Sequence, residues 1–324
     1  GYMTCARRPG SVGYEVQDAA TYANWTVDYL KYDNCYSNPL TLRSRYTAMH
    51  DALNATGRPI FFSMCEWGWQ DPATWASDLG NSWRTTGDIK PTWDSWTKIL
   101  DKNDAWYDRA GPGGWNDPDM LEVGNGEMEN NLVESRSHFT LWCLIKAPLL
   151  LGNDLRNLSD DVLKIITNPE VIAWNQDKAG HQGHKVATYK SNSAIGTIST
   201  PAVVTSLNRR QLRQASHMAA DHREKHEDDV IGVSSSEGPL QVWAGNLTDH
   251  NIALVLFNRS PVRANITAHW EDLGLAATTK MNVRCVWWHK ELGSWSGSFT
   301  TDVESHGVAA FQLLPVGALQ NMGN

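Results

Sequence analysis

The chain lacks several features that would assign it to familiar classes of protein. Basic residues are the minority, with 28 Lys and Arg against 36 Asp and Glu, and the net charge of -8 argues against a nucleic-acid partner. No apolar run reaches the ~18 residues of a membrane span, so no membrane partner is expected. The first residues do not resemble a signal peptide. The cysteines number 5, and this odd count excludes a framework in which all are paired.

The composition is that of a globular protein with a large core. Of the 324 residues, 41% are hydrophobic, which suits one or two domains. The 16 Trp are unusual; most are expected in the core, and a few could stack on sugar rings, whose C–H faces pack on indole. Asn-x-Ser/Thr sequons favour a secretory route. They lie at Asn24, Asn54, Asn157, Asn246, Asn258 and Asn265.

Strand and helix patterns alternate between residues 27 and 154. Strands are predicted at 27–33, 59–65, 83–88, 113–121 and 149–154. Helices are predicted at 40–53, after Asp71-Pro72, and at 93–106, 127–146 and 159–166. This order predicts a parallel sheet with right-handed crossovers, either doubly wound or a barrel. A barrel is favoured because acidic residues follow nearly every strand. They are Asp33, Glu66, Asp88, Asp119 and Asp154.

The pattern changes after residue 186. Short strands at 240–243, 252–257, 283–288 and 308–313 predict an antiparallel sandwich. The segment between, 187–236, contains no Trp and is rich in Ser, Thr, Arg, His and Ala. His222 and His226 are spaced to present two metal ligands on a helix face. No third ligand is obvious, so a solvated loop is the preferred interpretation.

Two aspartates suggest the cleavage of a glycosidic bond. Asp33 and Asp88 end strands that lie two apart in the predicted sheet. Retaining glycosidases use one carboxylate as nucleophile and one carboxylic acid as proton donor, about 5–5.5 Å apart. The nucleophile must stay ionised, which Lys31 or Arg84 would favour. The acid must keep its proton, through burial or the repulsion of its partner. From spacing alone, an Asp at a strand end is more often a helix cap or a turn residue than a catalytic group.

Five motifs occur in a fixed order along the chain. They are YLKYDNC at 29–35, CEWG at 65–68, WRTTGDI at 83–89, GGWNDPDML at 113–121 and APLLLGNDL at 147–155. Together they closely resemble glycoside hydrolase family 27, the α-galactosidases, and look most like the plant members. The resemblance covers 1–186 and 237–318. It implies a (β/α)8 TIM barrel followed by an antiparallel β-sandwich.

The resemblance also implies residue roles. Asp33 matches the nucleophile and Asp88 the acid/base. Residues matching the lining of the galactose pocket are Lys31, Cys65, Glu66, Trp67, Gly68, Arg84 and Met120. Cys5 and Cys35 match a disulfide pair, which would fix the loop that aims Asp33. No metal or organic cofactor is implied, since two carboxyl groups suffice.

Other residues in these motifs receive structural roles. Asp117, Asp119 and Asp154 are expected to form strand-end turns and to hydrogen-bond the catalytic loops. Cys143 and Cys285 lie in apolar runs and are expected to be inert core thiols. The bulky run 66–69 would crowd a 2-acetamido group, which favours galactose over N-acetylgalactosamine.

The chain departs from the family in two places. Gly1 to Cys5 resembles the loop after the third barrel strand, so the first three strands are expected to be absent. Their absence would also remove a Trp and an Asp-Asp pair that hold the sugar in the family. Without these strands, open sheet edges and exposed helix faces are expected to make the chain insoluble or inactive. The expected domains are a partial barrel at 1–180, an atypical, disordered insertion at 187–236 and a sandwich at 237–324. The insertion is either a translated intron or a genuine surface insertion.

The sequence therefore predicts a truncated, retaining exo-α-galactosidase. Its substrates would be terminal α-galactosides of oligosaccharides, galactomannans or glycoconjugates. A secreted protein of the cell wall or vacuole is expected, and no oligomeric state is predicted. The alternatives are a β-L-arabinopyranosidase of the same fold and a non-catalytic galactose-binding remnant.

Overall fold

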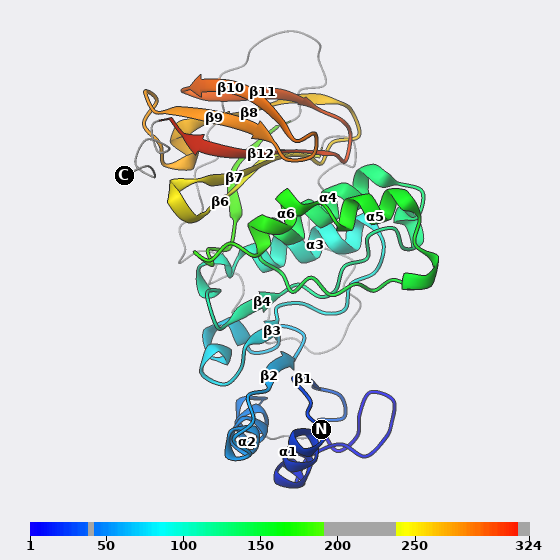
Figure 1. Ribbon diagram of the computed structural model, residues 1–324. Helices are drawn as coiled ribbons and strands as arrows, with labels where there is room; N and C mark the ends of the chain where they lie inside the picture. The colour runs from blue at the N-terminus through cyan, green and yellow to red at the C-terminus, as the bar shows by residue number, and fades with distance from the viewer. Residues whose placement is uncertain (38–41, 191–237, 317–324) are drawn as a thin grey trace.

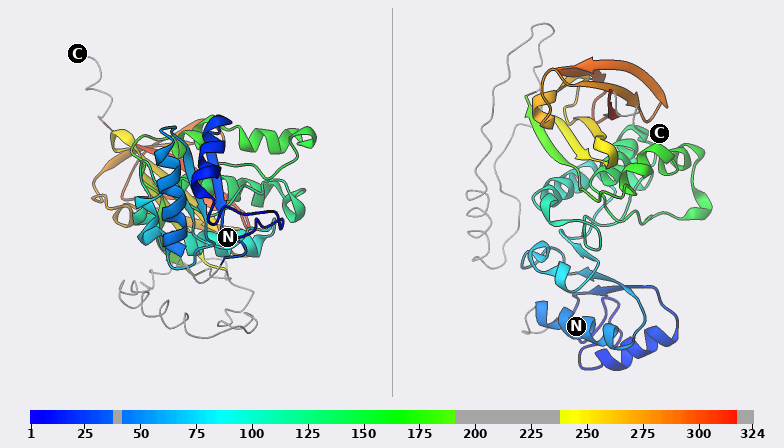
Figure 2. Two further views of the ribbon diagram at one scale, coloured as in Figure 1. Left: turned by 90° about the horizontal axis from the view of Figure 1, so that it is seen from below. Right: turned by 60° about the vertical axis from the view of Figure 1, so that its left-hand side comes forward.

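A parallel sheet and an antiparallel sandwich lie at opposite ends of the molecule, with helices between them (Figure 1). The computed structural model describes residues 1–37, 42–190 and 238–316. The second view in Figure 2 shows the same order of layers from another side. The two ends are therefore joined through a shared helical layer.

Parallel strands carry the acidic motifs. They are β1 (Tyr29–Asp33), β2 (Phe61–Cys65), β3 (Ser82–Arg84) and β4 (Trp115–Asp117), hydrogen-bonded in that order. The predicted β/α order is confirmed for these four. The strand predicted at 149–154 is wrong in extent. It forms only a parallel bridge, because within the described residues its backbone pairs with Leu121 alone.

The helices follow their capping residues. They are α1 (Glu15–Asn24), α2 (Leu42–Ala55), α3 (Trp93–Asp104), α4 (Leu132–Leu144), α5 (Asp160–Ile166) and α6 (Pro169–Asn175). The helix predicted at 127–146 begins later, because Asn131 caps α4 by accepting from the Glu134 N–H. Residues before it form the separate 3-10 turn η4 (Gly126–Met128). Helix α1 was not predicted, since Ala19 is its one buried residue and its apolar periodicity is weak.

The segment after Asp71 also differs from the prediction. It forms two 3-10 turns, η1 (Pro72–Thr74) and η2 (Ala76–Asp78). Proline occupies the first turn as expected, but the Asp71 side chain makes no cap hydrogen bond. Its backbone is left-handed, with φ of 48°. A Ser, Thr, Asn or Asp cap normally has extended backbone, so this conformation does not suit the predicted N-cap.

The sheet separates an apolar face from a polar one. Phe62, Met64 and Trp83 alternate with the motif residues and pack with α2 in one buried cluster. Strand residues one position away therefore point to the opposite face. That face carries the candidate site.

The C-terminal part is an antiparallel sandwich, as predicted. The larger sheet has the order β10-β9-β12-β7-β6-β5 and the smaller pairs β11 with β8. The strands are β5 (His184–Tyr189), β6 (Leu240–Asn246), β7 (Ile252–Asn258), β8 (Ala264–His269), β9 (Lys280–Cys285), β10 (Lys290–Ser296), β11 (Ser298–Val303) and β12 (Val308–Pro315).

Several boundaries here differ from the prediction, and strands β8, β10 and β11 were not predicted. Strand β5 includes residues 187–189, which the sequence assigned to the insertion. The rest of that segment from 191 on, with His222 and His226, lies outside the described residues. The strand expected at 283–288 ends at Cys285, and the next four residues turn into β10. This turn places Trp287 and Trp288 between strands rather than within one.

Helix α4 joins the two parts. Its Phe139, Leu141 and Trp142 share one buried cluster with Val255 and Phe257 of β7. Polar contacts reinforce this packing: Arg284 of β9 grips both carboxylate oxygens of Glu170 on α6, at 2.9 and 2.7 Å. The sandwich therefore packs directly against the helical layer.

Five of the six sequon asparagines have exposed side chains, and one is excluded from glycosylation. Asn258 is fully buried. Its amide nitrogen donates to Val262 and Val303 carbonyls, and its Oδ1 accepts from Ser260. In the described part of the chain, no helix combines the length and apolar character needed to cross a bilayer.

Candidate active site

The carboxyl ends of the parallel strands bring the predicted site residues into one row. Asp33 of β1 is the register partner of Cys65 on β2, and Arg84 of β3 is the partner of Asp117 on β4. Arg84 Nη1 lies 3.6 Å from the Cys65 sulfur, which links the two pairs. Residues that are distant in the sequence thus share one edge of the sheet, as a parallel βα arrangement requires.

Arg84 is the centre of this row. Its guanidinium is buried, and Nη2 lies 2.9 Å from Asp119 Oδ2 and 3.2 Å from Asp88 Oδ1. Nη2 also donates to the Gly87 carbonyl at 2.8 Å, one residue before Asp88. Arg84 therefore fixes the loop that carries Asp88 and contacts its carboxylate. The sequence analysis predicted that Arg84 could help to keep Asp33 ionised. The ion pairs of Arg84 are instead with Asp119 and Asp88.

Asp88 is exposed rather than buried. Its side chain is 80% accessible. The sequence analysis named burial as one of two ways in which the Asp88 carboxyl could stay protonated. The described residues do not bury the Asp88 side chain. Asp88 faces solvent from a loop that is itself anchored by buried groups.

Asp119 provides a second anchor for that loop. Its Oδ2 accepts from the Ile89 N–H at 2.9 Å, directly after Asp88. Its backbone has φ of 82°, and its carbonyl accepts from the Trp142 indole of α4. Asp119 therefore makes the predicted hydrogen bond to the loop that carries Asp88. Its ion pair with Arg84 was not predicted, because residues 35 positions apart give no sequence signal of a contact.

Asp117 lies beneath these groups, and Asp154 lies apart from them. Asp117 Oδ1 accepts from the Asp119 N–H, and burial raises the pKa of the Asp117 carboxyl. Asp154 caps the 3-10 turn η5 (Leu155–Asn157) and pairs with Arg156 at the surface. The turn role predicted for Asp154 is confirmed, whereas its bonds go to Arg156 and not to a catalytic loop.

Glu66 is a buried carboxyl group with unpaired oxygens. It is 0% exposed, and neither oxygen has a hydrogen-bond partner among the described residues. Burial raises its pKa well above 4.5, and the nearby charges of Asp117 and Asp33 act in the same direction. A protonated Glu66 would carry one donor and further acceptor capacity. That combination suits recognition of sugar hydroxyl groups.

Cys65 is a buried thiol that stays protonated. Burial raises its pKa to about 12. The thiolate is the nucleophilic form of cysteine, so Cys65 is unsuited to attack a substrate. It remains a small apolar group at the floor of the row, next to Asp33.

The Trp67-Gly68-Trp69 loop lies against the end of β3. Gly68 has φ of 80°, and a Cβ added there would lie 2.4 Å from the Thr85 carbonyl oxygen. Only glycine allows this close approach. Trp67 and Trp69 meet edge to face, with ring centroids 5.5 Å apart. The loop therefore presents two indoles beside Glu66.

Lys31 and Met120 are at the margin of the row. Lys31 is exposed on β1, two residues before Asp33 and on the same face. Met120 is 37% exposed, and its N–H donates to Asp119 Oδ1 at 2.8 Å. Both are accessible at the edge where the carboxylates lie.

Asp33 is held by groups that the sequence analysis did not name. The Asn34 N–H donates to Asp33 Oδ1 at 2.8 Å. The buried Asn34 side chain accepts from Arg45 of α2 at 2.7 Å. A disulfide joins Cys5 to Cys35, as the resemblance implied. These sulfurs lie near Asp33, but bridged sulfurs are not thiolate metal ligands.

Removing this disulfide should destabilise the chain measurably. The bridge spans 30 positions, and the chain-entropy relation gives about 3.6 kcal/mol for a loop of that length. We expect Cys5→Ala/Cys35→Ala to lower the unfolding free energy by this amount in urea titrations. Reductant should lower the stability of the unsubstituted chain equally and leave the double variant unchanged. Equal stability of the chain with and without reductant would contradict the prediction.

Glu66 should make stability depend on pH. Its folded pKa is raised by burial, so above pH 4.5 the unfolded state releases a proton that the folded state keeps. The free energy of unfolding then falls by up to about 1.4 kcal/mol per pH unit until the pH reaches the pKa of Glu66 in the folded state. We expect the stability of Glu66→Gln relative to the unsubstituted chain to rise between pH 4 and pH 7 in urea titrations.

The matched control is Glu127→Gln, at an exposed position. Its stability difference from the unsubstituted chain should be constant across the same pH range. A constant difference for Glu66→Gln as well would show that Glu66 ionises normally in the folded state.

A parallel β/α sheet with carboxyl groups at the carboxyl ends of its strands is the arrangement that α/β-barrel enzymes use for their active sites. Comparison with known proteins identifies the family. Residues 1–177 match the family described as alpha galactosidase A, and residues 237–313 match the alpha galactosidase C-terminal beta sandwich domain. The chain belongs to this melibiase family.

Relatives and solved structures agree with this assignment. The chain is 46% identical to an alpha-galactosidase of Cyamopsis tetragonoloba over 97% of its own length and 65% of that protein. It is 45% identical to the Coffea arabica alpha-galactosidase, over 97% and 70%. Alpha-galactosidase I of Mortierella vinacea superimposes with a TM-score of 0.77 at 33% identity, over 97% and 74%. The chain thus spans about two thirds of its plant relatives, and its fold corresponds to part of a family 27 barrel followed by the sandwich.

Proposed function

We propose that this chain carries the catalytic carboxyl groups of a retaining exo-acting α-galactosidase. The observation that supports this most is the row formed by Asp33, Cys65 and Arg84, with buried Glu66 directly after Cys65 and Asp88 in contact with Arg84. The substrates would be terminal α-linked galactosides of oligosaccharides, galactomannans or glycoconjugates. A relative from Saccharomyces cerevisiae has been solved with raffinose, a substrate of this class.

The reaction would proceed by double displacement. An Asp33 oxygen attacks the anomeric carbon while Asp88 gives its proton to the departing glycosidic oxygen, so one C–O bond forms as another breaks. Asp88 then removes a proton from water, whose oxygen attacks the anomeric carbon and releases Asp33. Two inversions leave the α configuration of galactose unchanged. This route uses only the two carboxyl groups and water.

The neighbouring groups would hold the galactose ring. The unpaired oxygens of Glu66 can bond hydroxyl groups, and Lys31 can donate from the exposed edge. Cys65 and Met120 would contact apolar faces of the sugar. Trp67, Gly68 and the Trp69 ring occupy space beside Glu66, which favours galactose over a sugar with a 2-acetamido group.

A secretory route is part of this proposal. The Cys5–Cys35 disulfide is of a kind that persists in oxidising compartments, and five sequons have exposed asparagines. The cell wall and the vacuole are the destinations we propose.

The test is hydrolysis of nitrophenyl α-galactoside with product anomers followed by proton NMR. The assay uses the 324-residue chain and an extended form, in which the part of the Cyamopsis tetragonoloba relative that this chain does not match completes it. We expect α-galactose as the first product of the extended form and little activity from the 324-residue chain alone. First release of the β anomer, or faster hydrolysis of the corresponding β-L-arabinopyranoside, would overturn the proposal. Galactose binding without hydrolysis in both forms would indicate a binding remnant instead.

A further inference from the structure

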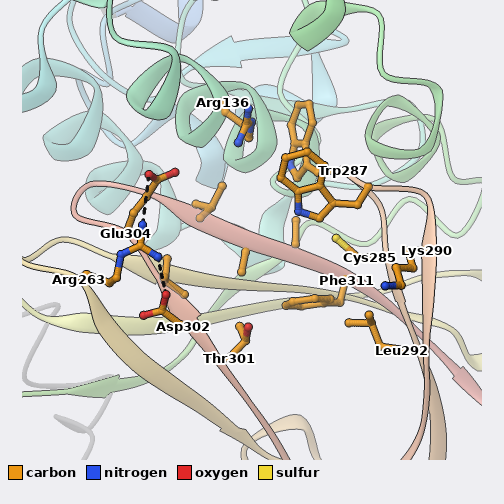
Figure 3. Close-up of a pocket in the computed structure, with 15 residues that line it drawn as sticks. Arg136, Arg263, Cys285, Trp287, Lys290, Leu292, Thr301, Asp302, Glu304 and Phe311 are labelled. Carbon is orange, nitrogen blue, oxygen red and sulfur yellow. Dashed lines mark hydrogen bonds and ion pairs between the residues drawn. The ribbon is translucent and has the colours of Figure 1, made fainter.

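A cavity lies away from the parallel sheet, where α4 meets the sandwich. Its volume is about 580 Å³. Its lining comes from α4, the β9–β10 turn, and strands β10, β11 and β12 (Figure 3). None of its residues belongs to the row around Asp33. The cavity is therefore separate from the candidate active site.

Arg136 of α4 is a cation in this lining that contacts two indoles but forms no ion pair with a described residue. Its Nε is buried and has no hydrogen-bond partner among the described residues. No ion pair joins Arg136 to any other described side chain. By contrast, Arg263 across the cavity pairs with both Asp302 and Glu304, as Figure 3 shows. An unpaired, partly buried guanidinium is costly unless a ligand satisfies it, because its donors are fixed and always charged.

Two indoles frame this guanidinium. The Arg136 carbon lies 5.3 Å from the Trp287 ring centroid and 5.7 Å from that of Trp288. Trp287 is anchored, since its Nε1 donates to Thr140 of α4 at 3.1 Å. Trp288 is 71% exposed. The anchored ring fixes the arginine, and the exposed ring offers a flat apolar surface beside it.

The charges of the lining favour an anion. It holds the cations Arg136, Arg263 and Lys290 against the carboxylates Asp302 and Glu304. Arg263 contacts both carboxylates, Lys290 has no ion pair with any described residue, and three cations against two carboxylates leave the lining with one net positive charge. Arg136 and Lys290 thus remain available. A planar carboxylate suits the forked donors of arginine best.

We propose that this cavity binds a uronic acid residue of an acidic polysaccharide. The pyranose ring would stack its C–H face on Trp288, and its carboxylate would pair with Arg136, with Lys290 nearby. A uronic acid combines the two features that the cavity recognises, a flat sugar ring and a carboxylate on that ring. The site would hold the protein on an acidic glycan without taking part in catalysis.

The test is isothermal titration calorimetry of the full chain with a trigalacturonide, and with the neutral galactose trisaccharide of the same linkage. We expect the acidic trisaccharide to bind at least about tenfold more tightly, since charge-assisted hydrogen bonds are lost in the neutral one. Trp288→Ala should weaken acidic binding by about tenfold, and its exposed position leaves the core intact. Arg136→Gln should remove the preference for the acidic sugar.

The matched controls replace residues of the same two types at other positions on the protein. Trp295→Ala removes another exposed indole of the sandwich, and Arg156→Gln another arginine, and neither should change the affinity. Acetate at equal concentration should not compete, because it lacks the sugar ring. Equal affinity for the two trisaccharides, unchanged binding by Arg136→Gln, or no binding at all would overturn the proposal.

Discussion

Replacing Asp33 by asparagine should lower kcat for α-galactoside hydrolysis by roughly 10⁴-fold or more in the extended chain. The amide cannot displace the leaving group, because it carries no negative charge. The geometry should persist: the Asn34 N–H that donates to Asp33 Oδ1 can donate equally to an amide oxygen. The loss should therefore appear in kcat, with an unchanged urea midpoint.

A second variant, Asp33→Gly, tests the role of Asp33 as nucleophile through the configuration of the product. With the carboxylate removed, azide can attack the anomeric carbon from the same side and yield β-galactosyl azide. Asp154→Asn is the control, since Asp154 also follows a predicted strand but pairs with Arg156 at the surface. More than about 1% residual kcat in Asp33→Asn, or azide product of α configuration, would exclude Asp33 as the nucleophile.

The parallel sheet could be predicted because its signals are local. Apolar runs bounded by helix caps recur through the N-terminal part, and each strand ends in an acidic motif. The sharing of one edge by Asp33 and Arg84 follows from topology, because the carboxyl ends of parallel strands lie together, whereas Asp88 lies in the loop four residues after β3. Strand β3 is only three residues long, yet its motif located Arg84 correctly.

The supporting contacts could not be predicted, because they join distant residues. The pairing of Arg84 with Asp119 and the Arg45–Asn34 bond depend on the packing of separate elements. Helix α1 and strand β10 were missed for another reason. Strand β10 is largely exposed, so its residues do not alternate in hydrophobicity.

The β9–β10 turn shows how composition can mislead. The run from Val283 to Trp288 is apolar enough for a strand, but the ladder with β12 stops at Cys285. The two tryptophans beyond it are used for packing on α4 and for lining the cavity. The hydrophobic content of this run correctly predicted that Val286 is buried. It wrongly predicted that the strand continues beyond Cys285.

Removing the Asp88 carboxyl should slow hydrolysis by an amount that depends on the leaving group. Without a general acid, a sugar alkoxide leaves unprotonated, and we expect raffinose-type substrates to lose roughly 10²–10⁴-fold in kcat/KM in Asp88→Ala. A nitrophenolate leaves readily without a proton, so cleavage of its galactoside should lose much less in the first step. The second step also lacks its base, and glycosyl-enzyme should accumulate.

Azide should rescue this second step, because it needs no deprotonation, and the product should be α-galactosyl azide. Asp94→Ala is a close control: Asp94 is also 80% exposed and also lies four residues from a basic partner, Lys98. Arg84 would lose one contact but keep Asp119, so the loop should hold its place. Equal losses on both substrates, or no rescue by azide, would assign Asp88 a structural role and leave the acid to be found among the buried carboxyl groups around Arg84.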